Sequence, residues 1–411
     1  MTFRIHSAVG FISILLFACG GVTDSSPDAS GVADGSPDGS VDSADAAPGD
    51  PDSAVIRDAE IPLDAPPAAV CSPDEVLRCE ADDLVICNED GSAEHDVTCA
   101  LGCDDTGPRC RDVDPSNDLA GFLDEADGEP VADLGDSATI NTDTGQVEVD
   151  GVPVAITSFV TGDEPEVRVF AVGGFVTNDV TLSGDRALAV VSDGDVEIRG
   201  HVSLSASGST GGPGAFDTPS CVGEEGEKNS PPGVVSYGGG GGGGFGSEGG
   251  SGGLGIADDD GEDVRAEGGA GGGTAGNEEL LPLRGGCSGV GAETIGGPAG
   301  GGGAVQLVSR TKITVDGILE ANGAGGRGGG EGSGGGGSGG GILLEAPQVT
   351  INGNVVANGG GGGAGTGFCG EDGDDGRTDD ERAPGGEGCG TATGDGGLGA
   401  AESLSATNGQ N

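Results

Sequence analysis

The chain has 411 residues, of which 93 are glycine; aromatic residues make up 3%, with one tyrosine and no tryptophan. Asp and Glu total 70 against 16 Lys and Arg, so the formal net charge is −54. Nucleic acids bind through cationic side chains, so this charge excludes a nucleic-acid partner. Glycine far above its usual ~7% and the scarcity of aromatic residues predict a small, aliphatic hydrophobic core.

The first residues have the pattern of a bacterial lipoprotein signal. Arg4 precedes an apolar run over 8–18, and Cys19 follows in the sequence LLFAC. A transmembrane helix needs about 20 apolar residues, whereas the hydrophobic part of a signal peptide needs about 7–15. We therefore expect residues 1–18 to be a signal peptide, Cys19 to be lipidated, and the mature chain to be anchored to a membrane. An ordinary cleaved signal with an unmodified Cys19 is the alternative.

The residue after this cysteine gives an expectation about location. Gly20, in place of an aspartate, resembles the enterobacterial signal for sorting to the outer membrane. We therefore expect a lipid anchor in the outer membrane, with the protein at the cell surface or on the periplasmic face. No later segment is apolar enough to cross a membrane.

Two linkers flank a cysteine-rich segment. Residues 19–66 consist mainly of Asp, Ser, Ala, Pro and Gly, a composition typical of disordered segments. In residues 67–114 there is no CxxC pair and only one histidine, His95, so zinc spacing is poorly met. A core this small usually needs covalent cross-links, which predicts a module with three disulfides. The spacing does not determine how its six cysteines pair: Cys71, Cys79, Cys87, Cys99, Cys103 and Cys110. Residues 115–135 are interpreted as a second linker with at most two helical turns around 119–126.

From residue 136 the sequence consists of short β-type runs and long glycine-rich stretches. Residues 303–323 match 339–359 at an offset of 36, and residues 187–208 form a third copy. Each copy holds three strand-like pieces, and a glycine-rich loop of variable length follows each one. Repeats with insertions at one fixed position are typical of solenoids. We therefore predict a mainly β protein in which residues 136–411 form a right-handed parallel β-helix with long glycine-rich loops and a polar C-terminal tail. A sandwich of antiparallel strands is the alternative.

A five-residue pattern of alternating apolar and polar positions, ended by glycine, occurs five times in this part of the chain. Alternation places the apolar positions on one face of a strand. The pattern predicts an interior row formed by Val147, Val180, Val196, Ile313 and Val349. It predicts an exterior row formed by Glu148, Thr181, Glu197, Thr314 and Thr350.

The two longest glycine-rich loops each contain two cysteines. After the signal cysteine and the six of the module, four cysteines remain, an even number that favours disulfides within each loop, Cys221–Cys287 and Cys369–Cys389. Loops closed in this way support the hypothesis that the glycines pack as polyproline-II-like strands, since the absence of side chains permits close approach. Flexible linker is the alternative.

Two acidic clusters within these loops are candidate calcium sites. Calcium takes six to eight oxygen ligands on a flexible backbone, and carboxylates supply them. The candidate ligands are Asp258, Asp260 and Glu262 in the first cluster and Asp372, Asp374 and Asp375 in the second. A solvated acidic loop without bound metal is the alternative. No other cofactor is expected.

Several of these motifs together resemble a known family. The signal with its cysteine, the acidic linker, the six-cysteine segment, the repeats GGGAVQLVS and ITVDGILEANGAGG, and the segment LPLRGGC over 281–287 are similar to glycine-rich surface lipoproteins of myxobacteria and related deltaproteobacteria. The resemblance implies a location at the cell surface. It implies no particular activity.

The sequence offers little for catalysis. His201 is the one histidine of the repeats, and we expect it to be a solvent-facing strand residue. A polysaccharide lyase or hydrolase would combine carboxylates with Arg186, Arg199 or Arg310, but Tyr237 is the only tyrosine available to stack on sugar rings. We therefore expect a non-enzymatic structural or adhesive surface protein, assisted by calcium, with extracellular polysaccharide or other surface components as partners. A carbohydrate-active β-helix enzyme is the alternative.

Overall fold

The computed structural model describes residues 4–8, 11–16, 70–104, 106–259, 262–277, 279–292, 297–329, 332–365, 370–388, 394–401 and 404–410. Several predictions lie outside this part of the chain: the lipidated Cys19, the linker 19–66, the calcium ligand Asp260 and the disulfide Cys369–Cys389. For Asp258 and Glu262, only the backbone is described.

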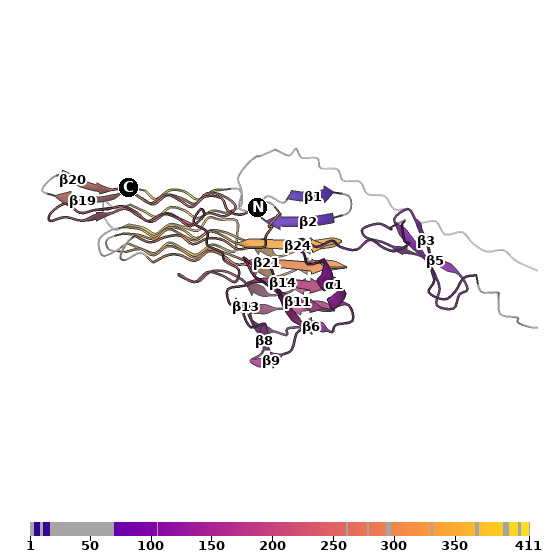
Figure 1. The fold of residues 1–411 in the computed structure, drawn as a ribbon. Coiled ribbons are helices and arrows are strands. Elements are labelled where there is room, and N and C mark those ends of the chain that lie inside the picture. Colours follow the sequence, from indigo (N-terminus) through magenta and orange to yellow (C-terminus); the bar gives the residue numbers. More distant parts are fainter. Residues whose placement is uncertain are drawn as a thin grey trace, which may run out of the picture.

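The described chain is mainly β, as predicted, and its strands form mixed sheets that are rich in parallel pairs (Figure 1). Sheet 1 contains, in spatial order, β1 (Arg4–Ala8), β2 (Phe11–Leu16), β24 (Gly341–Ala346), β21 (Ala304–Ser309), β14 (Ala187–Ser192), β11 (Val167–Val172) and β10 (Ser158–Thr161). Sheet 2 contains β25 (Gln348–Ile351), β22 (Lys312–Val315), β15 (Val196–Ile198), β12 (Gly174–Thr177) and β6 (Val131–Asp133). Sheet 3 contains β26 (Asn354–Val356), β23 (Ile318–Glu320), β16 (His201–Ser203), β13 (Asp179–Ser183), β7 (Ser137–Asn141), β8 (Gln146–Val149) and β9 (Val152–Val154).

Each of the three predicted copies contributes one strand to each sheet, and equivalent strands pair in parallel. This pairing excludes the antiparallel sandwich for the repeats. Residues 167–183 form a fourth copy, because β11, β12 and β13 pair in parallel with β14, β15 and β16. No single offset relates this copy to the next one, because the offset is 20 residues in sheet 1 (Val167–Ala187), 21 in sheet 2 (Phe175–Val196) and 22 in sheet 3 (Val180–Val202).

The predicted offset of 36 residues holds in sheets 2 and 3 but is wrong in sheet 1. Ile313 pairs with Val349, whereas Val305 pairs with Ile342, an offset of 37. Val305 and Ile342 both lie in the main core, and a slip of one residue would turn one of them outward. The turn absorbs the difference, since two residues separate β21 from β22 and one residue, Pro347, separates β24 from β25.

The main core lies between the three sheets, and a second core covers the outer face of sheet 1. Alternate residues of β21 face the two cores: Val305 and Leu307 point inward, Ala304 and Val308 outward. For this reason all six residues of β11, β14, β21 and β24 are buried. Both cores are aliphatic, with phenylalanine as the only aromatic contribution.

All five members of the predicted interior row contact the main core, but only three of them are aligned in one row. Val196, Ile313 and Val349 are aligned neighbours in sheet 2. Val180 instead pairs with Val202 in sheet 3, and Val147 lies in β8, which is antiparallel to β7. The pattern does not identify which strands are aligned neighbours, because any half-buried strand that ends in a glycine turn has it.

The segment interpreted as a second linker packs against sheet 1. It contains α1 (Ala120–Ala126), within the expected range, and β6 of sheet 2. Leu119, Leu123 and Ala126 are buried, and the first two contact the outer face of sheet 1. Their spacing of four and three residues places them on one face of the helix.

The six-cysteine segment folds around the antiparallel strands β3 (Val76–Glu80), β4 (Asp83–Cys87) and β5 (Glu94–Thr98). Three disulfides close it, as predicted, and the structure supplies the pairing that the spacing left open: Cys71–Cys87, Cys79–Cys103 and Cys99–Cys110.

At the edge of sheet 1 opposite β10, β1 and β2 form a hairpin, and β2 pairs with β24. These strands lie within the predicted signal peptide. No helix in the described residues combines the length and hydrophobicity needed to cross a membrane.

Candidate functional site

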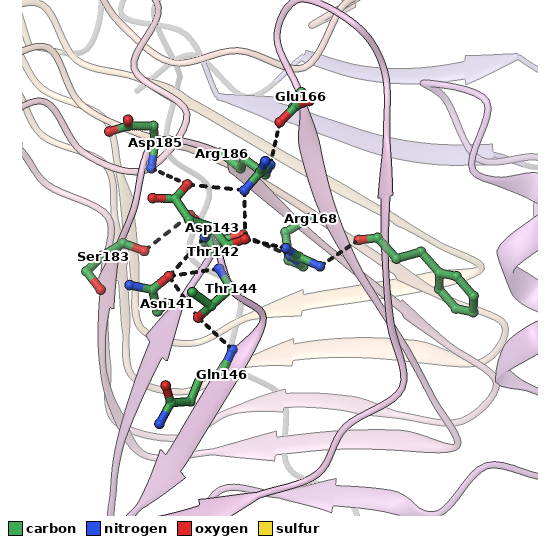
Figure 2. A network of polar contacts seen from close by, with 11 residues as sticks. Asn141, Thr142, Asp143, Thr144, Gln146, Glu166, Arg168, Ser183, Asp185 and Arg186 are labelled. Carbon is green, nitrogen blue, oxygen red and sulfur yellow. Dashed lines mark hydrogen bonds and ion pairs between the residues drawn. The ribbon is translucent and has the colours of Figure 1, made fainter.

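A polar network closes the end of sheet 1 beside the turn between β7 and β8 (Figure 2). Arg168, on β11, donates from Nε to the carbonyl oxygen of Thr142 at 2.8 Å and from Nη2 to that of Asp143 at 2.6 Å. Arg186 donates to the same Asp143 carbonyl at 2.7 Å and also pairs with Glu166. The two guanidinium groups therefore attach the turn to the sheet.

Arg168 is nearly buried, with 8% of its surface exposed, and its hydrogen-bond partners are backbone carbonyls. Burial, and next the charge of Arg186, lower the pKa of its guanidinium below the ordinary value. All the bonds of this group run to the protein's own backbone, so the arrangement serves to hold the turn.

The three arginines of the enzyme hypothesis are each paired with carboxylates. Arg186 belongs to the network above. Arg199, the residue after β15, donates a hydrogen bond to Glu197 within that strand. Arg310 bonds Asp193 at 2.7 Å and Asp112 at 2.9 Å, which ties the end of the cysteine module to sheet 1. The structure places the three at separate positions, so they do not form one site.

His201 lies on the exposed side of sheet 3, as expected, and contacts a buried carboxylate. Its Nε2 is 2.9 Å from Oε1 of Glu320, and the hydroxyl of Ser203 donates to the same oxygen at 2.7 Å. Asn322 donates to the other oxygen at 3.1 Å. A nucleophilic serine must donate to the imidazole, whereas Ser203 donates to the carboxylate. The cluster therefore has the residue types of a triad without its connectivity.

The second acidic cluster lies beside a glycine-rich segment. The carboxylates of Asp372 and Asp375 accept hydrogen bonds from the N–H groups of Gly328 and Gly325, both at 2.7 Å. In the described residues, no group of three or more His, Cys, Asp or Glu side chains is arranged to hold a metal ion. These two carboxylates thus have protein donors as partners.

The glycine-rich loops form extended strands with a three-residue hydrogen-bond repeat. In residues 238–244, successive N–H groups donate to three different neighbours: those of 238, 241 and 244 to residues 227, 224 and 221, those of 239 and 242 to 253 and 250, and those of 240 and 243 to 333 and 336. Polyproline II has three residues per turn, so its N–H groups face three directions in rotation. This repeat supports the polyproline-II hypothesis for the loops.

Glycine is required in this packing because Cα atoms closely approach carbonyl oxygens of neighbouring strands. A Cβ on Gly240 would lie 1.8 Å from the oxygen of Val290, and one on Gly337 would lie 1.9 Å from that of Gly300. Real Cβ atoms essentially never come within 3.0 Å of another heavy atom in this way. The second α-hydrogen of glycine occupies this space and points at the oxygen, which is the geometry of a Cα–H···O contact.

A disulfide joins Cys221 to Cys287, the pair expected from the sequence. It links two of the glycine strands near the sheets. The strands then run side by side away from the sheets, and the hairpin β19 (Gly255–Asp259) and β20 (Glu262–Ala266) lies at the far end (Figure 1). We call this assembly of glycine strands, residues 221–303, 321–341 and 357–410, the glycine bundle.

The sequence suggested the polyproline-II conformation of glycine-rich stretches such as GGGGGGGFGSEGGSGG as a hypothesis, but it did not show which strands are neighbours in the bundle. No family model matches the chain, and no curated protein or solved structure was found to be similar to it.

Proposed function

We propose that the protein is a lipid-anchored cell-surface protein with a structural or adhesive role and without catalytic activity. The observation that carries the proposal is the glycine bundle, a projecting element of closely packed backbone strands. Many of its glycines are buried, and the side chains exposed on it include carboxylates such as Glu224, Glu225, Asp372 and Asp374. This arrangement suits contact with another extended polymer better than it suits catalysis.

We further propose that residues 136–411 are built on a right-handed parallel β-helix that supports the bundle. Four copies each contribute one strand to each of three sheets, and the glycine segments leave the sheets after the third strand. Right-handed crossovers between parallel strands are strongly preferred, which supports the assigned hand. The β-helix would give the bundle a rigid base.

The polar groups also favour a non-enzymatic role. Arg186, Arg199 and Arg310 hold carboxylates of the protein, and Ser203 donates to Glu320. A carbohydrate-active enzyme would need such groups to be available to substrate. It would also need platforms for sugar rings, for which the sequence holds a single tyrosine and no tryptophan.

The anchor is tested separately. Cys19→Ser removes the site of lipidation, so we expect the variant to leave the membrane fraction while the wild type stays in it. Partition into detergent phase and intact mass spectrometry measure the two properties. An unchanged membrane fraction for the variant would contradict the anchor.

The role is tested by binding. The purified full chain, with its disulfides formed, is applied to immobilised extracellular polysaccharides and to bacterial envelopes, in calcium and in chelator. Retention on a surface component without release of sugar supports adhesion, and loss of retention in chelator supports calcium assistance. Release of reducing sugar or unsaturated products would replace the proposal with the lyase or hydrolase.

A further inference from the structure

Six strands of the glycine bundle enclose a cavity of about 490 Å³. Each strand is hydrogen-bonded to the next around a closed ring, at 2.8–3.0 Å, through the pairs Gly243–Gly336, Gly360–Gly337, Gly362–Gly397, Thr407–Leu398, Gly409–Ser251 and Gly242–Gly250. The cavity therefore lies where a further strand would be surrounded by six neighbours.

Three alternate strands of the ring carry N–H groups that the bundle leaves unused. These groups belong to cavity-lining residues three positions apart in each strand: Gly250 and Gly253, Gly336 and Gly339, Gly397 and Ala400. None of them donates a hydrogen bond to another described residue. Gly336 is buried and the other five residues are half-buried, so these six donors are available to acceptors of a bound chain.

The spacing of the donors identifies the ligand class. In polyproline II the rise is about 3.1 Å per residue, so donors three residues apart repeat every ~9.3 Å. Carbonyl oxygens on one side of another polyproline-II strand repeat at the same distance. We propose that the cavity binds an extended glycine-rich segment of another polypeptide as a seventh strand of the ring.

The cavity is long enough for such a segment. Residues 332–340 line the cavity without interruption, and nine residues in this conformation span about 28 Å. The occupant needs glycine wherever it approaches the ring closely, as the bundle's own strands do at Gly240. A second copy of this chain is not the expected source, because its described glycine strands are already hydrogen-bonded within its own bundle. The inference rests on the adhesive role and names its partner class.

The test uses the purified full chain and a synthetic peptide, acetyl-(Gly-Gly-Ser)4-amide, in titration calorimetry. We expect saturable binding and none for dodecaproline, which keeps the backbone conformation and the carbonyl acceptors but carries a ring at every position where the occupant needs glycine. Hydrogen exchange should slow at Gly336, Gly339 and Gly397 on binding and stay unchanged in the cysteine module. This readout uses the wild type, so it does not depend on any variant folding.

Two variants locate the site. A Cβ on Gly362 would have its nearest neighbour 3.3 Å away, at the nitrogen of Gly397, so Gly362→Leu should fold and project into the ring. We expect it to weaken binding at least tenfold, whereas Gly121→Leu on α1, with open space around its Cβ, should leave affinity unchanged.

No binding of the peptide at millimolar concentration would overturn the proposal. So would binding without slowed exchange at the six donors, or competition by cellohexaose, which would indicate a carbohydrate channel. Because the assay contains no cell envelope, a negative result leaves the surface role itself to the binding experiment above.

Discussion

Substitution of Gly240 by alanine tests the packing of the glycine bundle most directly. The added Cβ would lie 1.8 Å from the oxygen of Val290, where at least 3.0 Å is needed, so the two strands must separate by 1.2 Å. That movement would break the 3.0 Å bond from Val290 to Gly241 and disturb the 2.9 Å bond from Gly335 to Val290. Two bonds at about 1 kcal/mol each, with ~1–3 kcal/mol for the groups left unsatisfied, give a loss of about 3–5 kcal/mol.

The measurement is thermal unfolding together with hydrogen exchange over residues 238–244. The matched control is Gly362→Ala, whose Cβ would be 3.3 Å from its nearest neighbour. We expect the control to change stability by less than ~1 kcal/mol, since its strain is offset by the smaller entropy of the unfolded chain. Equal stability and equally fast exchange for both variants would refute close packing and restore the flexible-linker interpretation.

Three further predictions concern the supports of the fold. Replacement of Cys221 and Cys287 by serine opens a loop with a sequence separation of 66 and should lower the free energy of unfolding by about 4 kcal/mol, from the entropy of the opened loop. Denaturant unfolding measures this loss, and an unchanged midpoint would contradict it. Leu119 is 0% exposed on the outer face of sheet 1, so Leu119→Ala leaves a cavity and should lower the free energy of unfolding by about 2–5 kcal/mol in the same denaturant experiment. Leu281→Ala, at a residue that is 45% exposed, should change it little. Burial raises the pKa of Glu345, so the folded state holds this proton more tightly than the unfolded chain does. Relative to Glu345→Gln, the wild type should therefore lose thermal stability as pH rises from about 4 towards 7; a constant difference would refute this.

The repeats were predictable because each strand follows an alternating pattern and the copies share it. Sequence comparison did not locate the one-residue shift in sheet 1, because a single offset of 36 over the whole copy matches Val305 with Gly341, whereas its partner in the sheet is Ile342. Nor could it show that residues 115–135 pack. Leu119 and Leu123 form an apolar face only if the helix exists, and the partner surface on sheet 1 is far away in the sequence.

The candidate site was less predictable than the fold, because it consists of backbone. Glycine composition alone is compatible with a flexible linker and with a packed bundle. What separates the two is the arrangement of hydrogen bonds between distant segments, for example from Gly243 to Gly336. The acidic residues were recognisable as a cluster, but their partners, the N–H groups of Gly325 and Gly328, carry no signature in the sequence.

The acidic residues and the cavity are two outcomes of the same geometry. A strand in this bundle presents N–H groups in three directions, so a direction without a neighbouring strand leaves donors unpaired. At Gly325 and Gly328 the carboxylates of Asp375 and Asp372 take the place of the missing carbonyls, three residues apart as a strand's carbonyls would be. The donors of the six-strand ring have no such carboxylate in the described residues. The chain has 70 acidic residues whose carboxylates could accept hydrogen bonds from these N–H groups, as Asp372 and Asp375 do at Gly328 and Gly325. Because no described carboxylate does so in the ring, we interpret the open donors as the binding position of another strand.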